Sequence, residues 1–131
     1  MNGGHHLMVV LSNSKAGLED EFNDWYSRVH IFDTVNKLDG FIAGQRFVQA
    51  DLEGAPTTGH RYLAIYEIPE DSLATAYESL LWGRADRAQA AKDGRAPAVP
   101  VSEALDTDTF LVGFFSPMGE PVLKTTGGDS A

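Results

Sequence analysis

The chain has 131 residues, of which 43% are hydrophobic and 22% are charged, and its formal net charge is −9. This length suits one domain, and the composition is that of an ordinary globular protein rather than a disordered chain. The negative charge repels nucleic-acid phosphates and anionic lipid, so we expect neither as a partner. The absence of cysteine excludes disulfides and thiolate sites, and no apolar stretch approaches the length of a membrane span. We therefore expect a cytoplasmic protein.

The N-terminal part is predicted to form a strand followed by a helix. Residues 7–12, "LMVVLS", are a short apolar run typical of a buried strand. Beyond Gly17, apolar residues recur at spacings of three and four, as they do on one face of a helix. These residues are Leu18, Phe22, Trp25, Tyr26 and Val29. We expect the helix to end near His30, where a helix C-terminus would favour the protonated form of the imidazole.

The middle of the chain is predicted to form a β-hairpin. Residues 41–50, "FIAGQRFVQA", follow a turn signal and are rich in aromatic and β-branched residues. Residues 60–68, "HRYLAIYEI", have the same character, and the segment between the two runs has the composition of a loop. Arg46 and Glu67 then lie on neighbouring strands, where they could form a cross-strand ion pair.

The C-terminal part begins with a second predicted helix, over residues 72–88, where apolar residues return to helical spacing. Basic residues gather on this helix and just beyond it, and they alternate with acids in a way that indicates a solvated helix face. They are Arg84, Arg87, Lys92 and Arg95. A long proline-spaced connection leads to a fourth predicted strand at 109–116, and residues 117–131 are expected to form a tail.

The predicted element order is β-α-β-β-α-β. It indicates a ferredoxin-like α+β fold, with a four-stranded antiparallel sheet and two helices on one face. We assign residues 1–131 to one domain with its core at about 7–116. The opposite face of the sheet also carries aromatic or apolar residues, and one domain cannot close over it. We therefore expect a homodimer that forms through the sheet faces.

The segment 21–47, "EFNDWYSRVHIFDTVNKLDGFIAGQRF", resembles the dimeric α+β barrel superfamily, near its EthD-like members. The shared pattern is an aromatic residue and then a histidine in the first helix, followed by a short segment into "GF" and a strand. The resemblance extends over roughly residues 7–116 and implies a dimeric barrel with a small-molecule pocket between the sheet and the helices. The superfamily includes cofactor-free monooxygenases, polyketide cyclases and lactone isomerases, so the resemblance implies chemistry without a cofactor.

The resemblance carries over His30 as the acid or base of a proton transfer. On a helical wheel His30 lies at the edge of the apolar stripe, from which an imidazole can reach a pocket, although packing or capping would explain the same position. Asp33 could orient the ring, but many relatives have "HLPD" where this chain has "HIFD". Tyr26, one turn before His30, could join the same cluster or belong to the core.

Candidate ligand-binding residues lie on the predicted hairpin. Arg46 could bind a carboxylate instead of forming an ion pair. His60 and Tyr66 share one strand face and would line a polar cavity if that face is the concave one, whereas exposure at the strand edge also explains His60. The adjacent His5 and His6 point apart in an extended chain, so we expect no metal site there.

No nucleotide-binding loop, zincin motif or serine-hydrolase motif occurs in the sequence. The favoured hypothesis is a small cofactor-independent enzyme that moves a proton on an aromatic, lactone or polyketide-like metabolite. Two alternatives stay open: a non-catalytic dimeric ligand-binding or stress-associated module, and a cofactor-free monooxygenase.

Overall fold

A computed structural model describes residues 4–125 of the chain. Its strands are β1 (His6–Ser12), β2 (Ala43–Val48), β3 (Tyr62–Ile68) and β4 (Leu111–Phe115). They form one antiparallel sheet in the order β2-β3-β1-β4. Residues 117–125 of the predicted tail are exposed and form no helix or strand, and residues 126–131 lie outside the described residues.

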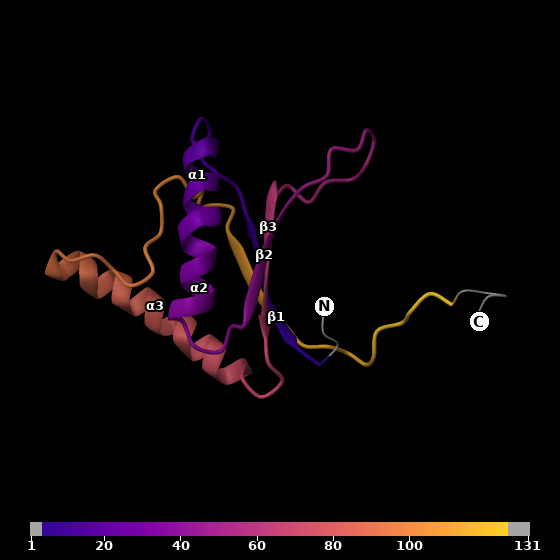
Figure 1. The fold of residues 1–131 in the computed structure, drawn as a ribbon. Coiled ribbons are helices and arrows are strands. Elements are labelled where there is room, and N and C mark those ends of the chain that lie inside the picture. Colours follow the sequence, from indigo (N-terminus) through magenta and orange to yellow (C-terminus); the bar gives the residue numbers. More distant parts are fainter. Residues whose placement is uncertain (1–3, 126–131) are drawn as a thin grey trace.

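The helices lie together on one side of the sheet (Figure 1). The segments α1 (Glu19–Trp25), η1 (Tyr26–His30) and α2 (Ile31–Lys37) follow one another without a break and make one long helix, in which η1 is a π-helical turn. The second helix is α3 (Leu73–Asp93). The prediction of a ferredoxin-like sheet with two helices on one face is confirmed. None of the helices in the described part of the chain is long and apolar enough to cross a membrane.

Alternation along the strands gives the sheet a helix-covered face and an open face. In β3, Tyr62, Ala64, Tyr66 and Ile68 are buried at every second position beneath the helices. The residues between them, with their partners on neighbouring strands, form the open face. Its apolar members include Leu7, Val9, Leu11, Phe47, Leu63 and Ile65. Figure 1 shows no element over this face within residues 4–125.

The first helix does not end near His30, as the sequence suggested, but continues to Lys37. A π turn holds more residues per turn than an α turn, so each residue of η1 advances through a smaller angle about the axis. His30 is therefore rotated into the buried stripe, and Val29 is rotated away from it. Val29 is 40% exposed, so its predicted place in the packing stripe is wrong.

The predicted "LDG" turn follows this helix and fixes its contact with α3. Gly40 has a φ of +96°, a conformation that side chains other than glycine rarely adopt. A Cβ on Gly40 would lie 2.6 Å from the backbone nitrogen of Ala76. The turn that follows α2 therefore lies directly against the first turns of α3.

Candidate functional site

A cavity of about 290 Å³ lies between the helix-covered face of the sheet, both helices and the connection from α3 to β4. Its wall is mostly apolar, and the buried side chains of Met8 and Val10 form part of it. The polar side chains in the wall come from four parts of the chain: Tyr26, His30, Thr34, Tyr66, Arg84, Arg87 and Thr107. This is the composition of a site for a small molecule, in which a few polar groups orient an apolar ligand.

His30 is held between two aromatic rings. Its imidazole stacks on Trp25, with 4.5 Å between ring centroids, and lies edge-on to Tyr26 at 4.9 Å. Burial, together with the charges of Arg87 and Arg46, lowers the pKa of His30 from 6.5 to about 4, although a hydrogen bond to the Pro100 backbone opposes this shift. Nδ1 is buried and has no hydrogen-bond partner within residues 4–125. The carbonyl of Pro100 can only accept, so Nε2 carries the proton and Nδ1 keeps a free lone pair.

The predicted protonated form of His30 is therefore wrong. The imidazole lies in the middle of a long helix, where no helix C-terminus offers its partial negative charge. Burial without a counterion favours the neutral ring instead. At neutral pH, His30 is a hydrogen-bond acceptor and a base rather than a cation.

Tyr26 and Tyr66 form a buried pair beside His30. The Tyr66 hydroxyl donates to the Tyr26 hydroxyl over 3.1 Å. Burial raises the pKa of both tyrosines, so both are protonated at neutral pH. The Thr34 hydroxyl, also in the cavity wall, donates to the carbonyl of His30 over 2.9 Å. The site thus combines neutral hydroxyls with one neutral imidazole.

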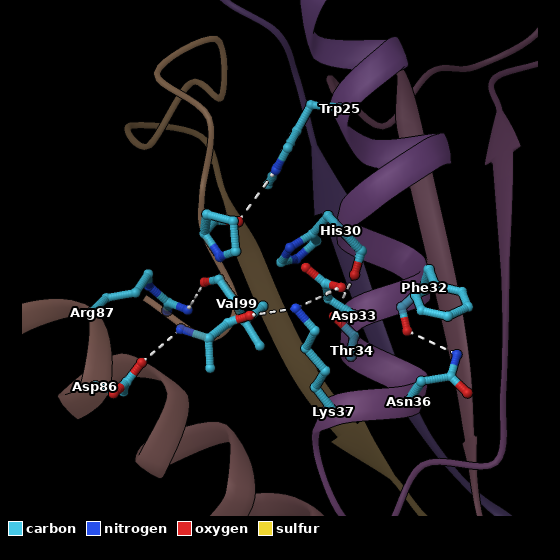
Figure 2. Close-up of polar contacts among 12 residues, drawn as sticks. Trp25, His30, Phe32, Asp33, Thr34, Asn36, Lys37, Asp86, Arg87 and Val99 are labelled. Atoms are coloured by element: carbon cyan, nitrogen blue, oxygen red, sulfur yellow. Dashed lines mark hydrogen bonds and ion pairs between the residues drawn. The ribbon is translucent and has the colours of Figure 1, made fainter. Parts of the chain in front are cut away.

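The connection from α3 to β4 closes one side of the cavity. We call residues 98–100 of this connection the strap. Each carbonyl of the strap accepts a hydrogen bond from a different helical side chain (Figure 2). Lys37 Nζ donates to Ala98 O (3.1 Å), Arg87 Nη1 to Val99 O (3.1 Å) and Trp25 Nε1 to Pro100 O (3.2 Å). The Ala98 N–H also donates to Asp86 Oδ2 over 2.8 Å. These four hydrogen bonds hold the strap, which forms no helix or strand, in place as part of the cavity wall.

Two arginines of α3 reach the cavity, and neither was predicted as a site residue. Arg95 pairs with Asp86 at 2.8 Å on the outer surface, as a solvated face would. Arg87, by contrast, is half-buried in the cavity wall, and burial together with the nearby Arg84 lowers its pKa. Arg84 is exposed and lies at the cavity mouth. The prediction of a wholly solvated basic face is therefore wrong for Arg87.

A signal for Arg87 was present in the sequence. It follows Ala76, Leu80 and Gly83 at spacings of three and four, which places it on the buried stripe of α3.

Asp33 does not orient the His30 ring. It is 6% exposed and pairs with Lys37, with 3.3 Å between Oδ1 and Nζ. No hydrogen bond joins it to His30 in the described part of the chain, because the helix continues and turns the two side chains to different neighbours (Figure 2). The carboxylate instead holds Lys37, which binds the strap.

Arg46 and Glu67 lie on opposite faces of the sheet, so the predicted ion pair is wrong. The strand register pairs Arg46 with Ala64 and Glu67 with Ala43. The Arg46 guanidinium lies on the helix-covered face, 4.6 Å from the centroid of the Tyr26 ring. It donates to Ser27 Oγ (2.8 Å) and Asn23 Oδ1 (2.9 Å) and does not line the cavity.

The remaining histidines also lie outside the cavity. His60 precedes β3, and its Nε2 lies 2.7 Å from the carbonyl of Thr109. His6 begins β1, and its ring contacts Ser116 Oγ and Glu70 O, both at 2.9 Å. His5 lies 3.9 Å from Glu67. No group of three or more histidine, cysteine or acidic side chains in the described residues could hold a metal ion.

The sequence matches no protein-family model and no curated protein. Solved structures match its fold. The crystal structure of an ethyl tert-butyl ether D (EthD) family protein from Bacillus halodurans aligns with 83% of this chain and 96% of its own, with a TM-score of 0.50 and 13% identity. A protein from Arabidopsis thaliana aligns with 89% of this chain and 99% of its own, with a TM-score of 0.51 and 18% identity. The chain therefore shares the ferredoxin-like α+β fold of these two proteins, one of which is an EthD family protein.

Proposed function

We propose that the chain is a small enzyme that acts without a cofactor and moves a proton on an apolar metabolite of aromatic, lactone or polyketide-like structure. The observation that carries this proposal is a neutral imidazole with an unpartnered nitrogen, held in the wall of a mostly apolar cavity. A base needs a lone pair that no other group of the protein already engages.

The proposed step is an isomerisation through an enolate. His30 takes a proton from a carbon next to a carbonyl group, and the electron pair of that C–H bond moves into the carbonyl to give an enolate. The Tyr26 ring lies edge-on to the imidazole, and its hydroxyl accepts from Tyr66 and keeps its own proton, which it would donate to the enolate oxygen. The imidazolium then returns the proton to another carbon of the same molecule, so the reaction needs no oxidant or reductant.

A non-catalytic ligand-binding module is the second candidate, and the same histidine favours it. A pKa of about 4 makes His30 a weak base, and such a ring serves well as a fixed hydrogen-bond acceptor for a ligand hydroxyl. In that case ligand binding would stabilise the fold without any turnover.

We also propose that the chain forms a homodimer through the open face of the sheet and works in the cytoplasm. The open face supports the dimer because Phe47, Leu111 and Phe115 are 40%, 56% and 57% exposed on it. Burying such side chains against a second copy would remove a continuous apolar surface from water.

The experiment is a screen of enolisable aromatic ketones, lactones and polyketide-like phenols, read out by thermal shift and by deuterium uptake from D₂O into the ligand. The proposed enzyme accelerates uptake, and His30→Gln abolishes the acceleration while ligands still raise the melting temperature. His60→Gln, the matched control outside the cavity, keeps wild-type uptake. Binding without His30-dependent uptake would establish the binding module instead, and oxygen consumption with a phenol would indicate a monooxygenase.

A further inference from the structure

We infer that the ligand carries a carboxylate, which binds Arg87 and Arg84 at the mouth of the cavity, so that the ligand class is an apolar carboxylic acid. This inference rests on the proposed function, because it assumes that the cavity holds a small molecule. It adds the chemical group by which that molecule is recognised.

The first observation is that the two guanidinium groups have donors to spare. Arg87 uses Nη1 for the carbonyl of Val99, and a guanidinium has five N–H donors. Arg84 makes no hydrogen bond or ion pair with any residue in the 4–125 range. The strap contact fixes the orientation of Arg87, so its remaining donors are positioned before a ligand arrives.

The second observation is that neither arginine forms an ion pair with a carboxylate of residues 4–125. The cavity wall contains no aspartate or glutamate. Asp86, next to Arg87 in sequence, is already held by Arg95 and by the N–H of Ala98. Two arginines without an ion-pair partner in the described residues therefore face one cavity of a chain whose net charge is −9, and Asp86 acts on Arg87 only at longer range.

The third observation is the position of the arginines relative to the apolar wall. Arg84 is exposed at the mouth, whereas Met8, Tyr26 and Tyr66 are buried at the inner end. A ligand with an apolar body and one terminal carboxylate matches this polarity. A partly desolvated arginine binds a carboxylate more strongly than an exposed one and can do so in bidentate geometry.

A neutral ligand of the same shape would leave the Arg87 guanidinium partly desolvated and without a charged partner. Burial of an unpaired charge costs free energy, so a neutral ligand should bind less tightly than a carboxylate. An anion beside Arg87 would also offset the charge that lowers the pKa of His30. Carboxylate binding would thus make His30 a better base for the proposed proton transfer.

The test compares 2-naphthoate with 2-naphthamide by isothermal titration calorimetry on the intact chain at neutral pH. We expect the acid to bind at least about tenfold tighter than the amide. Added salt should weaken binding of the acid and leave binding of the amide unchanged. Arg87→Gln and Arg84→Gln should each reduce affinity for the acid by about tenfold and leave affinity for the amide unchanged. Lys92→Gln, which removes an exposed charge from the same helix, is the matched control and should bind like wild type.

Arg84→Gln keeps the inference testable if Arg87→Gln loosens the strap, because Arg84 takes no part in the strap. Equal affinity for acid and amide would overturn the carboxylate inference and leave the proposed function standing. Arginine-dependent binding of the acid, without His30-dependent deuterium uptake by any ligand, would uphold the inference and remove the proposed catalysis. Failure of both probes to bind would overturn the inference.

Discussion

Replacing His30 by glutamine should remove a large part of the acid sensitivity of the fold. The pKa of His30 is lowered from its ordinary value of 6.5 to about 4 by burial, so the unfolded chain takes up this proton before the folded chain does. The stabilisation from the neutral ring is complete above pH 6.5 and is lost as the pH falls toward 4. At 1.36 kcal/mol per unit, the loss over this window is on the order of 3 kcal/mol.

Urea unfolding followed by tryptophan fluorescence, repeated at several pH values across this window, measures the effect. The free energy of unfolding of the wild type should fall relative to that of His30→Gln by on the order of 3 kcal/mol from neutral pH to the acid end. His60→Gln is the matched control for loss of an imidazole outside the cavity. A constant difference between wild type and His30→Gln would refute the reasoning, since it would mean that the ring titrates equally in both states.

Further predictions concern the wall and the surface of the domain. Gly83→Ala should raise the free energy of unfolding by about 0.5–1 kcal/mol, because alanine is the better helix former and a Cβ on residue 83 of α3 would make only ordinary contacts, at 3.6 and 3.8 Å. A lower free energy of unfolding in urea would contradict this. Lys37→Met should cost about 1–3 kcal/mol, since it strips the buried Asp33 of its ion pair, and an unchanged midpoint would show that the pair contributes nothing. Val9→Asp or Ile65→Asp, neighbours on the open face, should convert the proposed dimer to monomer in light scattering, and an unaffected dimer would place the interface elsewhere.

The fold was predictable because each element carries its own periodicity. Alternation along residues 60–68 assigns Tyr62, Ala64 and Tyr66 to one face, and the structure buries all three. The turn signal at Gly40 likewise marks a real constraint, because only glycine fits against Ala76 there. Local patterns of this kind depend on a few neighbouring residues, and one sequence displays them directly.

The cavity was less predictable because it depends on contacts between distant parts of the chain. The π turn moves His30 into the buried stripe, and nothing in the residues Tyr26–His30 distinguishes this turn from an α turn. The sequence of the strap has no hydrophobic periodicity. Its position is set by hydrogen-bond donors that lie far from it in the sequence, such as the side chains of Trp25 and Lys37. Arg46 lies on the predicted strand but does not pair with Glu67. An ion pair between neighbouring strands requires both side chains to lie on the same face of the sheet, and these two lie on opposite faces.

The strap joins the stability of the domain to the shape of its site. Lys37, Arg87 and Trp25 each hold one strap carbonyl, and two of them, Arg87 and Trp25, also line the cavity. Substitution of either lining residue therefore changes the ligand contacts and the wall together, and a loss of binding alone would not separate the two effects. Arg84 differs because it lines the mouth without touching the strap. It is consequently the position at which ligand charge recognition can be altered while the cavity keeps its form, and the acid-to-amide affinity ratio of Arg84→Gln reports on that recognition directly.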